Sequence, residues 1–502
     1  MPDVRARPRW DRRAMAISGV PLGPAAVLFD GWQHGGGGSP ARRAPGVRRR
    51  LRRCAVAATV AAIVAGDAAA SVVVEARRRG LAGSFGAAAV PTATPAGDAA
   101  ARLSAGAWSY FADPRIVADA RSMHVYYTGV ATMSGHVKVV RYDARSGATE
   151  VVSVGQTGGD DHNNPAFYLR RDGRLTAFFS PHSGRLLPRD RRSAMYYRTT
   201  VKAGDIARWT RRRTVPVNAP GGLGYTYPNP LRIADGVFLA WRGGGWLPTY
   251  SVRESGGRWG RAREIARGPA GQRPYAKYAS AGPARRSAHI AYTERHPVSG
   301  ATGVHYLGYR HRSGLYRADG RWVGGRSAMP VPSRAGDTVE AYSDEMGSSW
   351  AMDVGDDHGR PVIVYARGVD GRPVMTYRYA RYDGKRWTAH TITTASDAPW
   401  HQFGGGHFET GGVVLDHEDP STVVLSRVEG ATAVVQEWTT PDGGTTWMQV
   451  RRLSPAGRNC FRPAVSRGDG PESKLVGFIC GRLDHWTDFD TDLYVRYITA
   501  RG

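Results

Sequence analysis

The chain has 502 residues, enough for two or three average domains or for one large repetitive domain. It contains 64 glycines, a composition that favours many tight turns over long helices. The formal net charge is +26 and is carried almost wholly by arginine, so the surface attracts polyanions in general. Only three cysteines are present, with no Cys-x-x-Cys pair, which argues against a cysteine-based zinc site.

The first hundred residues differ from the rest of the chain. Residues 1–53 are rich in Arg, Pro and Gly and are predicted to be a disordered basic leader. Residues 54–100 are predicted to be a signal-peptide-like segment and linker. A basic flank at 48–53 precedes an apolar core at 54–64 and a run of small residues at 65–71. This pattern predicts export to a secreted, periplasmic or cell-surface location, the alternative being a disordered basic arm.

That apolar core is too short to span a bilayer as an ordinary helix, so no stable membrane insertion is expected.

Residues 101–502 have one uniform sequence pattern and are predicted to form a single domain. Short runs of β-branched and aromatic residues, such as those at 136–142 and 361–365, alternate with Gly- and Asp-containing turns. No segment shows a helical apolar period of helical length. The chain is therefore predicted to be all-β.

A repeated unit predicts the architecture. A turn followed by Trp recurs at Trp259, Trp322 and Trp387, and four-strand units of about 50 residues are typical of a propeller. We expect seven blades, with eight as the alternative; a large sandwich or a β-helix is the competing architecture. Residues 440–447 fit the "Asp box" turn of sialidase-like propellers, which is structural. Cys460 and Cys480 lie on neighbouring predicted strands, as a disulfide or as two buried thiols.

Four polar motifs stand out between residues 160 and 245. They contain His162, His182, Tyr227 and Arg242. Loops from different blades meet at one end of a propeller's channel, so these side chains can face one pocket. His162 and His182 are one hairpin's length apart, which can bring their rings side by side.

The ordered set of motifs resembles a known family. It comprises the segments at 160–165, 180–182, 225–230, 241–242, 273–278, 296–297 and 415–420. As a set they resemble the BNR-repeat propellers that include ulvan lyases and related uronate-directed polysaccharide lyases. The resemblance implies that residues 101–502 are a β-propeller catalytic domain of seven blades, in which Tyr227, Arg242, His162 and His182 form the catalytic site.

The chemistry of these residue types is consistent with that implication. Cleaving a 4-linked uronate by β-elimination removes the C5 proton and expels the C4 oxygen, and the ionised carboxylate opposes this step. Arg242 with a histidine can neutralise the carboxylate. A tyrosine whose pKa is lowered by a neighbouring arginine can serve as base and then acid, which is the role expected for Tyr227. Either histidine could instead be the base.

Further residues are assigned by the same motifs. Asn163, Tyr225, Lys277 and Tyr278 are expected to bind substrate. His417, Glu418 and Asp419 are expected to form a structural loop network, the alternative being a cation site. No cofactor is expected to be required. No metal is assigned. A structural metal site near His296 is not expected, because the strand that follows it has no Cys. A structural cation elsewhere remains an alternative.

The expected partner is an anionic polysaccharide rather than nucleic acid, and the expected state is a monomer. Two other functions stay open. A sialidase-like glycoside hydrolase needs two carboxylates about 5–10 Å apart, and a sialidase needs three arginines, of which only Arg115 and Arg242 are identified. A non-catalytic glycan-binding propeller is the third reading of the same residues.

Overall fold

A computed structural model describes residues 99–119, 121–182, 195–216, 225–269, 272–282, 284–296, 302–342, 349–369, 372–396, 410–470 and 473–499. Every described residue belongs to the unit formed by residues 89–502. The leader predicted at 1–53 and nearly all of the segment predicted at 54–100 lie outside the described residues and stay predictions.

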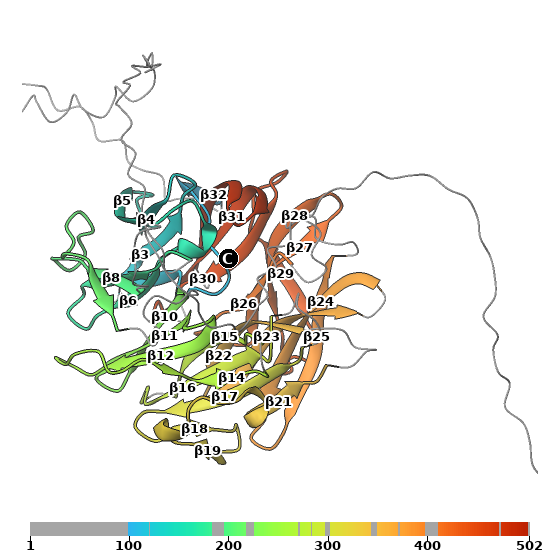
Figure 1. The fold of residues 1–502 in the computed structure, drawn as a ribbon. Helices are drawn as coiled ribbons and strands as arrows, with labels where there is room; N and C mark the ends of the chain where they lie inside the picture. Colours follow the sequence, from blue (N-terminus) through green and yellow to red (C-terminus); the bar gives the residue numbers. More distant parts are fainter. Residues whose placement is uncertain are drawn as a thin grey trace, which may run out of the picture. The chain divides into compact units, whose positions relative to one another are not determined.

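Seven antiparallel sheets form the blades of a propeller, which confirms the predicted seven-bladed all-β fold and excludes eight blades (Figure 1). Six sheets have four strands and one has six. The first three sheets are β2 (Ile116–Asp119), β3 (Ser122–Ala131), β4 (His136–Asp143) and β5 (Thr149–Gln156); β6 (Ala166–Leu169), β7 (Leu175–Phe179), β8 (Met195–Thr199) and β9 (Arg213–Val215); and β10 (Thr226–Ile233), β11 (Gly236–Gly243), β12 (Leu247–Arg253) and β13 (Arg263–Glu264).

The fourth sheet has two extra strands, and the others repeat the four-strand plan. They are β15 (Tyr275–Ala281), β16 (Ser287–Thr293), β17 (Val304–Arg310), β18 (Gly314–Tyr316), β19 (Trp322–Gly324) and β21 (Asp337–Glu340); β22 (Ser349–Asp357), β23 (Arg360–Val369), β24 (Arg372–Tyr382) and β25 (Trp387–Ser396); β26 (Val413–Leu415), β27 (Thr422–Glu429), β28 (Thr432–Thr439) and β29 (Met448–Arg452); and β30 (Cys460–Val465), β31 (Ser473–His485), β32 (Asp488–Thr499) and β1 (Ala101–Ala105).

Small elements complete the described chain. Strands β14 (Ala266–Arg267) and β20 (Val331–Pro332) pair in parallel, and the 3-10 turns are η2 (Asp161–Asn163), η4 (Arg326–Ala328) and η5 (Ser333–Ala335). No α-helix occurs among these residues, and none of their helices is long and apolar enough to cross a membrane.

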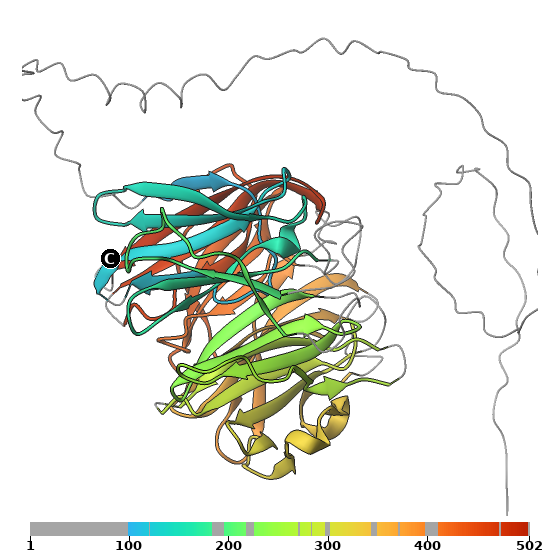
Figure 2. The ribbon, with the colours of Figure 1, turned by 60° about the vertical axis from the view of Figure 1, so that its left-hand side comes forward.

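The two ends of the propeller sequence close the ring in one sheet. The first strand, β1, pairs with the last strand, β32, through Ala101↔Val495. Figure 2 shows the blue strands at the start of the described chain beside the red strands at its end. Closure joins segments about 390 residues apart, so the blades are held as one ring.

Burial grades from the inner strand of each blade to the outer one. All residues of β2, β26 and β30, the innermost strands of their blades, are buried, whereas the outer strand β29 is mostly exposed. Inner strands packed on both faces carry continuous apolar runs, and outer strands face water on one side.

Two cross-links stabilise individual blades. Cys460 of β30 and Cys480 of β31 are paired in register and form a disulfide. In the Asp box, Asp442 accepts hydrogen bonds from the Thr446 amide (2.8 Å) and hydroxyl (2.7 Å), and Trp447 packs 5.1 Å from Tyr379 of the preceding blade. The Asp box is thus a structural turn.

The loop between β1 and β2 lies among the inner strands. Asn229 of β10 donates to the Phe111 carbonyl (2.8 Å), and Lys277 of β15 donates to the Tyr110 carbonyl (2.6 Å). Trp108 donates to the Arg462 carbonyl (2.8 Å). This loop therefore supports the starts of several inner strands, where the candidate site lies.

Candidate active site

A short 3-10 turn between β5 and β6 positions the first histidine. Asp160 caps this turn, and its carboxylate accepts the His162 backbone amide (2.9 Å). His182 follows the end of β7, the next strand of the hairpin. The two imidazole rings stack with centroids 3.9 Å apart and planes 7° apart, so the predicted side-by-side placement is confirmed.

One carboxylate holds both rings. The Nδ1 atoms of His162 and His182 each lie 2.9 Å from an oxygen of Asp160. His162 Nδ1 also lies 2.6 Å from Asp161, which is ion-paired with the Arg462 guanidinium. An ionised carboxylate only accepts hydrogen bonds, so each Nδ1 carries a proton. A neutral His182 therefore keeps a free lone pair on Nε2.

The environment separates the two imidazoles electrostatically. Burial disfavours the charged form of His162, but Asp161 and Asp160 outweigh it and raise its pKa to about 9. Burial, the His162 charge and Arg242 lower the pKa of His182 to about 4. At neutral pH the pair consists of one cation and one neutral base.

The two acidic side chains of this cluster are held ionised. Burial opposes ionisation of Asp160, but the charge of His162 keeps its pKa below the usual range. The Arg462 guanidinium lowers the pKa of buried Asp161 against the same burial effect. Neither group is therefore a proton donor at neutral pH.

Tyr227 and Arg242 come from the next blade. Thr226 at the start of β10 pairs with Arg242 near the end of β11, so the hairpin register sets Arg242 beside Tyr227. Tyr227 has a φ of +59°, a strained value for a bulky residue and one that concentrates at functional sites. Its ring stacks 5.3 Å from that of His162.

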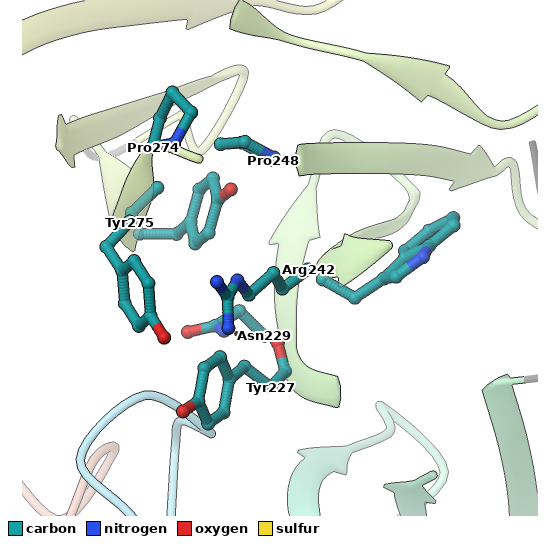
Figure 3. A pocket seen from close by; sticks show the side chains of 9 residues that line it. Tyr227, Asn229, Arg242, Pro248, Pro274 and Tyr275 are labelled. Carbon is teal, nitrogen blue, oxygen red and sulfur yellow. Dashed lines mark hydrogen bonds between the residues drawn. The ribbon is translucent and has the colours of Figure 1, made fainter. Parts of the chain in front are cut away.

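The guanidinium of Arg242 is held by aromatic rings and a carbonyl. It lies 4.0 Å from the Tyr275 ring centroid and 4.7 Å from that of Trp246, and its Nε donates to the Trp246 carbonyl (3.2 Å). Figure 3 shows it pointing toward the rings of Tyr227 and Tyr275. Arg242 is only 8% exposed. Even so, its guanidinium forms no ion pair with a carboxylate of the described residues.

The Tyr227 phenol differs from expectation. Burial, with a smaller contribution from Tyr275, raises its pKa well above the ordinary value, and Arg242 only partly offsets this rise. The prediction of a lowered tyrosine pKa is therefore wrong, because desolvation exceeds the effect of one neighbouring cation. A protonated phenol is suited to donate a proton.

Two cavities adjoin these groups. A small one of about 10 Å³ is lined by Tyr227, Asn229, Arg242 and Tyr275, among others (Figure 3). A more open one of about 370 Å³ is lined in part by Asp160, His182 and Trp246. Only the larger cavity has room for a sugar unit. The small volume of the other cavity shows how closely the Arg242 guanidinium and the Tyr227 phenol pack.

The sequence matches a described family over much of this region. The BNR repeat-containing family matches residues 125–395, more than half of the chain. The chain belongs to this family. No curated protein matches it.

Solved structures with this propeller fold include polysaccharide lyases. An ulvan lyase of polysaccharide lyase family 25 has a TM-score of 0.58 and 14% identity over 80% of this chain and 94% of that one. The values are the same for the lyase bound to -[GlcA(1-4)Rha3S]-. The polysaccharide lyase Uly1 has a TM-score of 0.50 and 13% identity over 84% and 94% of the two chains. At such identities the likeness shows the fold alone.

The four predicted catalytic residues of this BNR-family protein come together at one end of the inner strands. The predicted substrate contacts do not all join them. Asn163 is buried: it accepts the His182 backbone amide (2.7 Å) and lines the larger cavity. Tyr278 is also buried, at the edge of the small cavity.

Tyr225 and Lys277 are fully buried. The prediction that these two side chains contact substrate is therefore wrong. Lys277 is ion-paired with Asp113 and bonds the Tyr110 carbonyl, since the loop between β1 and β2 covers it. Arg115, one arginine of the sialidase alternative, is likewise paired with Asp113 (3.0 Å).

The motif at 416–419 lies beyond the opposite ends of the inner strands. His417 bonds Asp353 (3.0 Å), and Asp416 accepts the backbone amides of Glu418 (3.0 Å) and Asp419 (3.4 Å). These bonds form the expected loop network.

Sequence reasoning missed several residues of the site. Tyr275 and His296 lay in the matched motifs without an assigned role, and their rings are in contact. Burial and the charges of Arg242 and His162 lower the pKa of His296 to about 3. Arg462, Trp246 and Trp486 were not among the predicted site residues. One ligand atom each from Asp160, His162 and His182 lies within 4.8 Å of the others, so this trio could also hold a metal ion.

Proposed function

We propose that this protein is a polysaccharide lyase that cleaves a uronate-containing anionic polysaccharide, ulvan-like in type, by β-elimination. The observation that carries the proposal is the buried Arg242 guanidinium. It forms no ion pair with a carboxylate of the described chain and lies in the same cluster as cationic His162 and neutral His182. A bound carboxylate would complete this arrangement.

The first step is neutralisation of the substrate carboxylate. Arg242 and protonated His162 bind it and stabilise the negative charge that develops when the C5 proton leaves. Fixed cations in a buried site act strongly on such a charge because little water screens it. Without this neutralisation the C5–H bond is too weakly acidic to break.

The second step is proton transfer. His182 Nε2 removes the C5 proton, while Asp160 holds the opposite side of the ring. The C5–H electron pair forms the C4=C5 double bond, the C4–O4 bond breaks, and the Tyr227 phenol donates a proton to O4. The raised pKa of Tyr227 supports an acid role, and the low pKa of His182 supports a neutral base.

The two carboxyls of the histidine cluster are unsuited to the competing hydrolase function. A glycosidase needs one carboxylic acid with a raised pKa beside a second carboxylate. The pKa values of Asp160 and Asp161 are both lowered, and both carboxylates are engaged by histidine or arginine. The likeness in fold to ulvan lyases also supports elimination over hydrolysis.

The experiment is incubation of the protein with ulvan and other uronate polymers, followed by ultraviolet absorbance of the new double bond. Tyr227→Phe and His182→Ala are expected to abolish most of the signal. His358→Ala, which changes a fully exposed histidine, is the matched control. Reducing ends without the absorbance would indicate a hydrolase, and binding without cleavage would indicate a glycan-binding propeller.

Export is a second part of the proposal. The signal-like residues 54–71 and the Cys460–Cys480 disulfide both fit an oxidising compartment outside the cytoplasm. Expression of the full chain with N-terminal sequencing of protein recovered from the medium and periplasm checks it. An uncleaved chain found only in the cytoplasm would contradict export.

A further inference from the structure

A buried arginine of the last blade reaches the turn that carries His162. Arg462 belongs to β30 and is 4% exposed, and its guanidinium is ion-paired with Asp161 of η2. Asp161 is fully buried and lies 301 residues earlier in the chain. Its other carboxylate oxygen lies 2.6 Å from Nδ1 of His162. The ion pair therefore connects the last blade to one imidazole of the candidate site.

The backbone at Arg462 leaves the regular path of its strand. In the pairing of β30 with β31, Arg462 and Pro463 stand opposite one residue, because the register shifts between Phe461 and Ala464. Such a β-bulge re-aims a side chain and is common beside active sites. Arg462 has a φ of +53°, which costs on the order of 1–3 kcal/mol in a residue other than glycine. The strand thus deviates at the residue whose guanidinium contacts Asp161.

Several contacts hold Arg462 in this conformation. Its amide donates to the Gly411 carbonyl (2.6 Å), and its carbonyl accepts the Trp108 indole N–H (2.8 Å). The guanidinium also donates to the Trp108 carbonyl (2.7 Å) and lies 4.8 Å from the Tyr110 ring centroid. A side chain held on so many sides can fix the position of the carboxylate that it contacts.

The charges around His162 show what such an anchor supplies. Asp160 and Asp161 are neighbouring carboxylates, and both lie within ion-pair distance of the His162 ring. Buried charges interact strongly because little water screens them. Arg462 balances one carboxylate and protonated His162 balances the other, so the cluster of these four groups has no net charge. Removal of the guanidinium would leave a buried carboxylate without its partner, which is costly.

We propose that Arg462 is a positioning residue, which fixes Asp161 and through it the His162 ring at the place where a substrate carboxylate binds. The inference rests on the proposed function, since it takes His162 and Arg242 to bind that carboxylate. Arg462 lines neither of the two cavities of the site, so its effect on a bound substrate passes through Asp161.

Replacement of Arg462 should slow turnover more than it weakens binding. In Arg462→Met the His162 ring loses its fixed direction, while Arg242 still binds the substrate carboxylate. Because a displacement of about 1 Å at a reacting group can cost about 100-fold, kcat should fall about 10- to 100-fold and KM should change less than about threefold. Arg462→Lys keeps a cation and should recover part of kcat.

The experiment is a double-mutant cycle on ulvan cleavage. Double-bond absorbance gives kcat and KM for Arg462→Met, Asp161→Asn and the double variant, and circular dichroism checks their folding. Because Arg462 acts through Asp161, the double variant should be no slower than Asp161→Asn alone. The double variant replaces both partners of the ion pair, so it should fold even if Arg462→Met does not.

Lys474→Met is the matched control. It breaks a partly buried ion pair with Asp416 at the opposite end of the same blade. This variant should keep kcat within about twofold, because the change lies away from the candidate site.

A spectroscopic readout does not depend on turnover. The Nδ1 proton of His162 lies between two carboxylates and should give a downfield proton resonance in the nuclear magnetic resonance spectrum, identified by its loss in His162→Gln. The resonance should shift or disappear in Arg462→Met and stay in place in Lys474→Met.

The outcomes separate the two proposals. If ulvan is cleaved but Arg462→Met keeps its kcat, or if the two losses multiply in the double variant, positioning through Asp161 is refuted and the lyase function stands. If no uronate polymer is cleaved and the His162 resonance still depends on Arg462, positioning of the ring stands and elimination is refuted. An unchanged resonance in Arg462→Met overturns the positioning role in either case.

Discussion

The two ends of the central channel show opposite designs. The inner strands β10, β15 and β22 begin beside the candidate active site and end at a second cavity of about 810 Å³, lined by residues of all seven blades. This cavity is larger than the 370 Å³ cavity at the candidate active site, but its carboxylates already have partners within the protein. Asp356 bonds His289 (2.8 Å), Asp357 is ion-paired with Arg381, and Glu418 accepts the Gly468 amide (3.0 Å).

The active-site end is smaller and electrostatically incomplete. Arg242 has aromatic and carbonyl contacts but no carboxylate within the described chain, and the stacked imidazoles differ by about five in pKa. Size therefore does not identify the site. A buried cation that lacks a counter-ion indicates a place where a ligand carboxylate belongs, whereas paired charges indicate a structural role.

Exchange of one arginine at each end tests this contrast most strongly. Arg242→Ala should lower kcat by about 10²- to 10³-fold, because it removes a fixed charge that stabilises the transition state. Arg285→Ala, at the large cavity, should leave kcat within about twofold. Initial rates from double-bond absorbance give both values; equal losses would remove the functional distinction between the ends.

The pH profile tests the separation of the two histidines. Activity should be lost above about pH 9, as His162 loses its proton, and below about pH 4, as His182 gains one. Beyond either limit kcat/KM should fall about tenfold per pH unit. The profile should be flat between the limits.

His162→Gln removes the group responsible for the alkaline limit, so its residual activity should stay level above pH 9. A profile with a single limit near pH 6.5 in the wild type would show two ordinary histidines. The active-site end would then lose the feature that distinguishes it.

These residues also show what the sequence could predict. Recurring turns and a four-strand unit of about 50 residues predicted a propeller of seven blades, with eight as the alternative, and the hairpin spacing showed that His162 and His182 could lie side by side. The difference in their pKa values was beyond prediction, because it requires Asp160 and Asp161 to face the two rings differently at the 3-10 turn.

Burial caused the errors in the predicted site. Lys277 and Tyr225, like the predicted catalytic residues, lie within matched motifs, and a motif does not show which other segments cover its side chains. The loop between β1 and β2, more than 150 residues away in sequence, supplies the Asp113 and Tyr110 contacts that bury Lys277. Desolvation by tertiary neighbours likewise reversed the predicted pKa shift of Tyr227.

A charge at the far side of the channel should affect stability rather than catalysis. Asp353 is buried and contacts His417 (3.0 Å), the Leu415 amide (3.1 Å) and Arg467 (3.7 Å). Asp353→Asn should lower the free energy of unfolding by about 1–3 kcal/mol, because it removes the buried carboxylate that the His417 ring, the Leu415 amide and the half-buried Arg467 contact. Urea denaturation measures the loss, and kcat of the folded variant should change little.

Asp235→Asn, which changes an exposed aspartate, is the control for that loss and should unfold like the wild type. A variant of Asp353 that keeps its stability but loses its activity would place this charge network in the catalytic machinery instead.

The smallest effect is expected from metal removal. Asp160, His162 and His182 have the ligand types and spacing for a metal ion, but a metal must compete with the proton that both neighbouring aspartates stabilise on His162. Both Nδ1 atoms are also engaged with Asp160, so a metal would have to break those bonds. Dialysis against a chelator should therefore change kcat/KM less than about twofold, whereas added zinc should inhibit and more strongly at high pH, where the proton competes less. Activity that disappears on chelation and returns with one metal would convert the histidine pair from an acid–base device into a metal centre. The active-site end would then differ from the opposite end by its metal ligands and not by its unpaired cation.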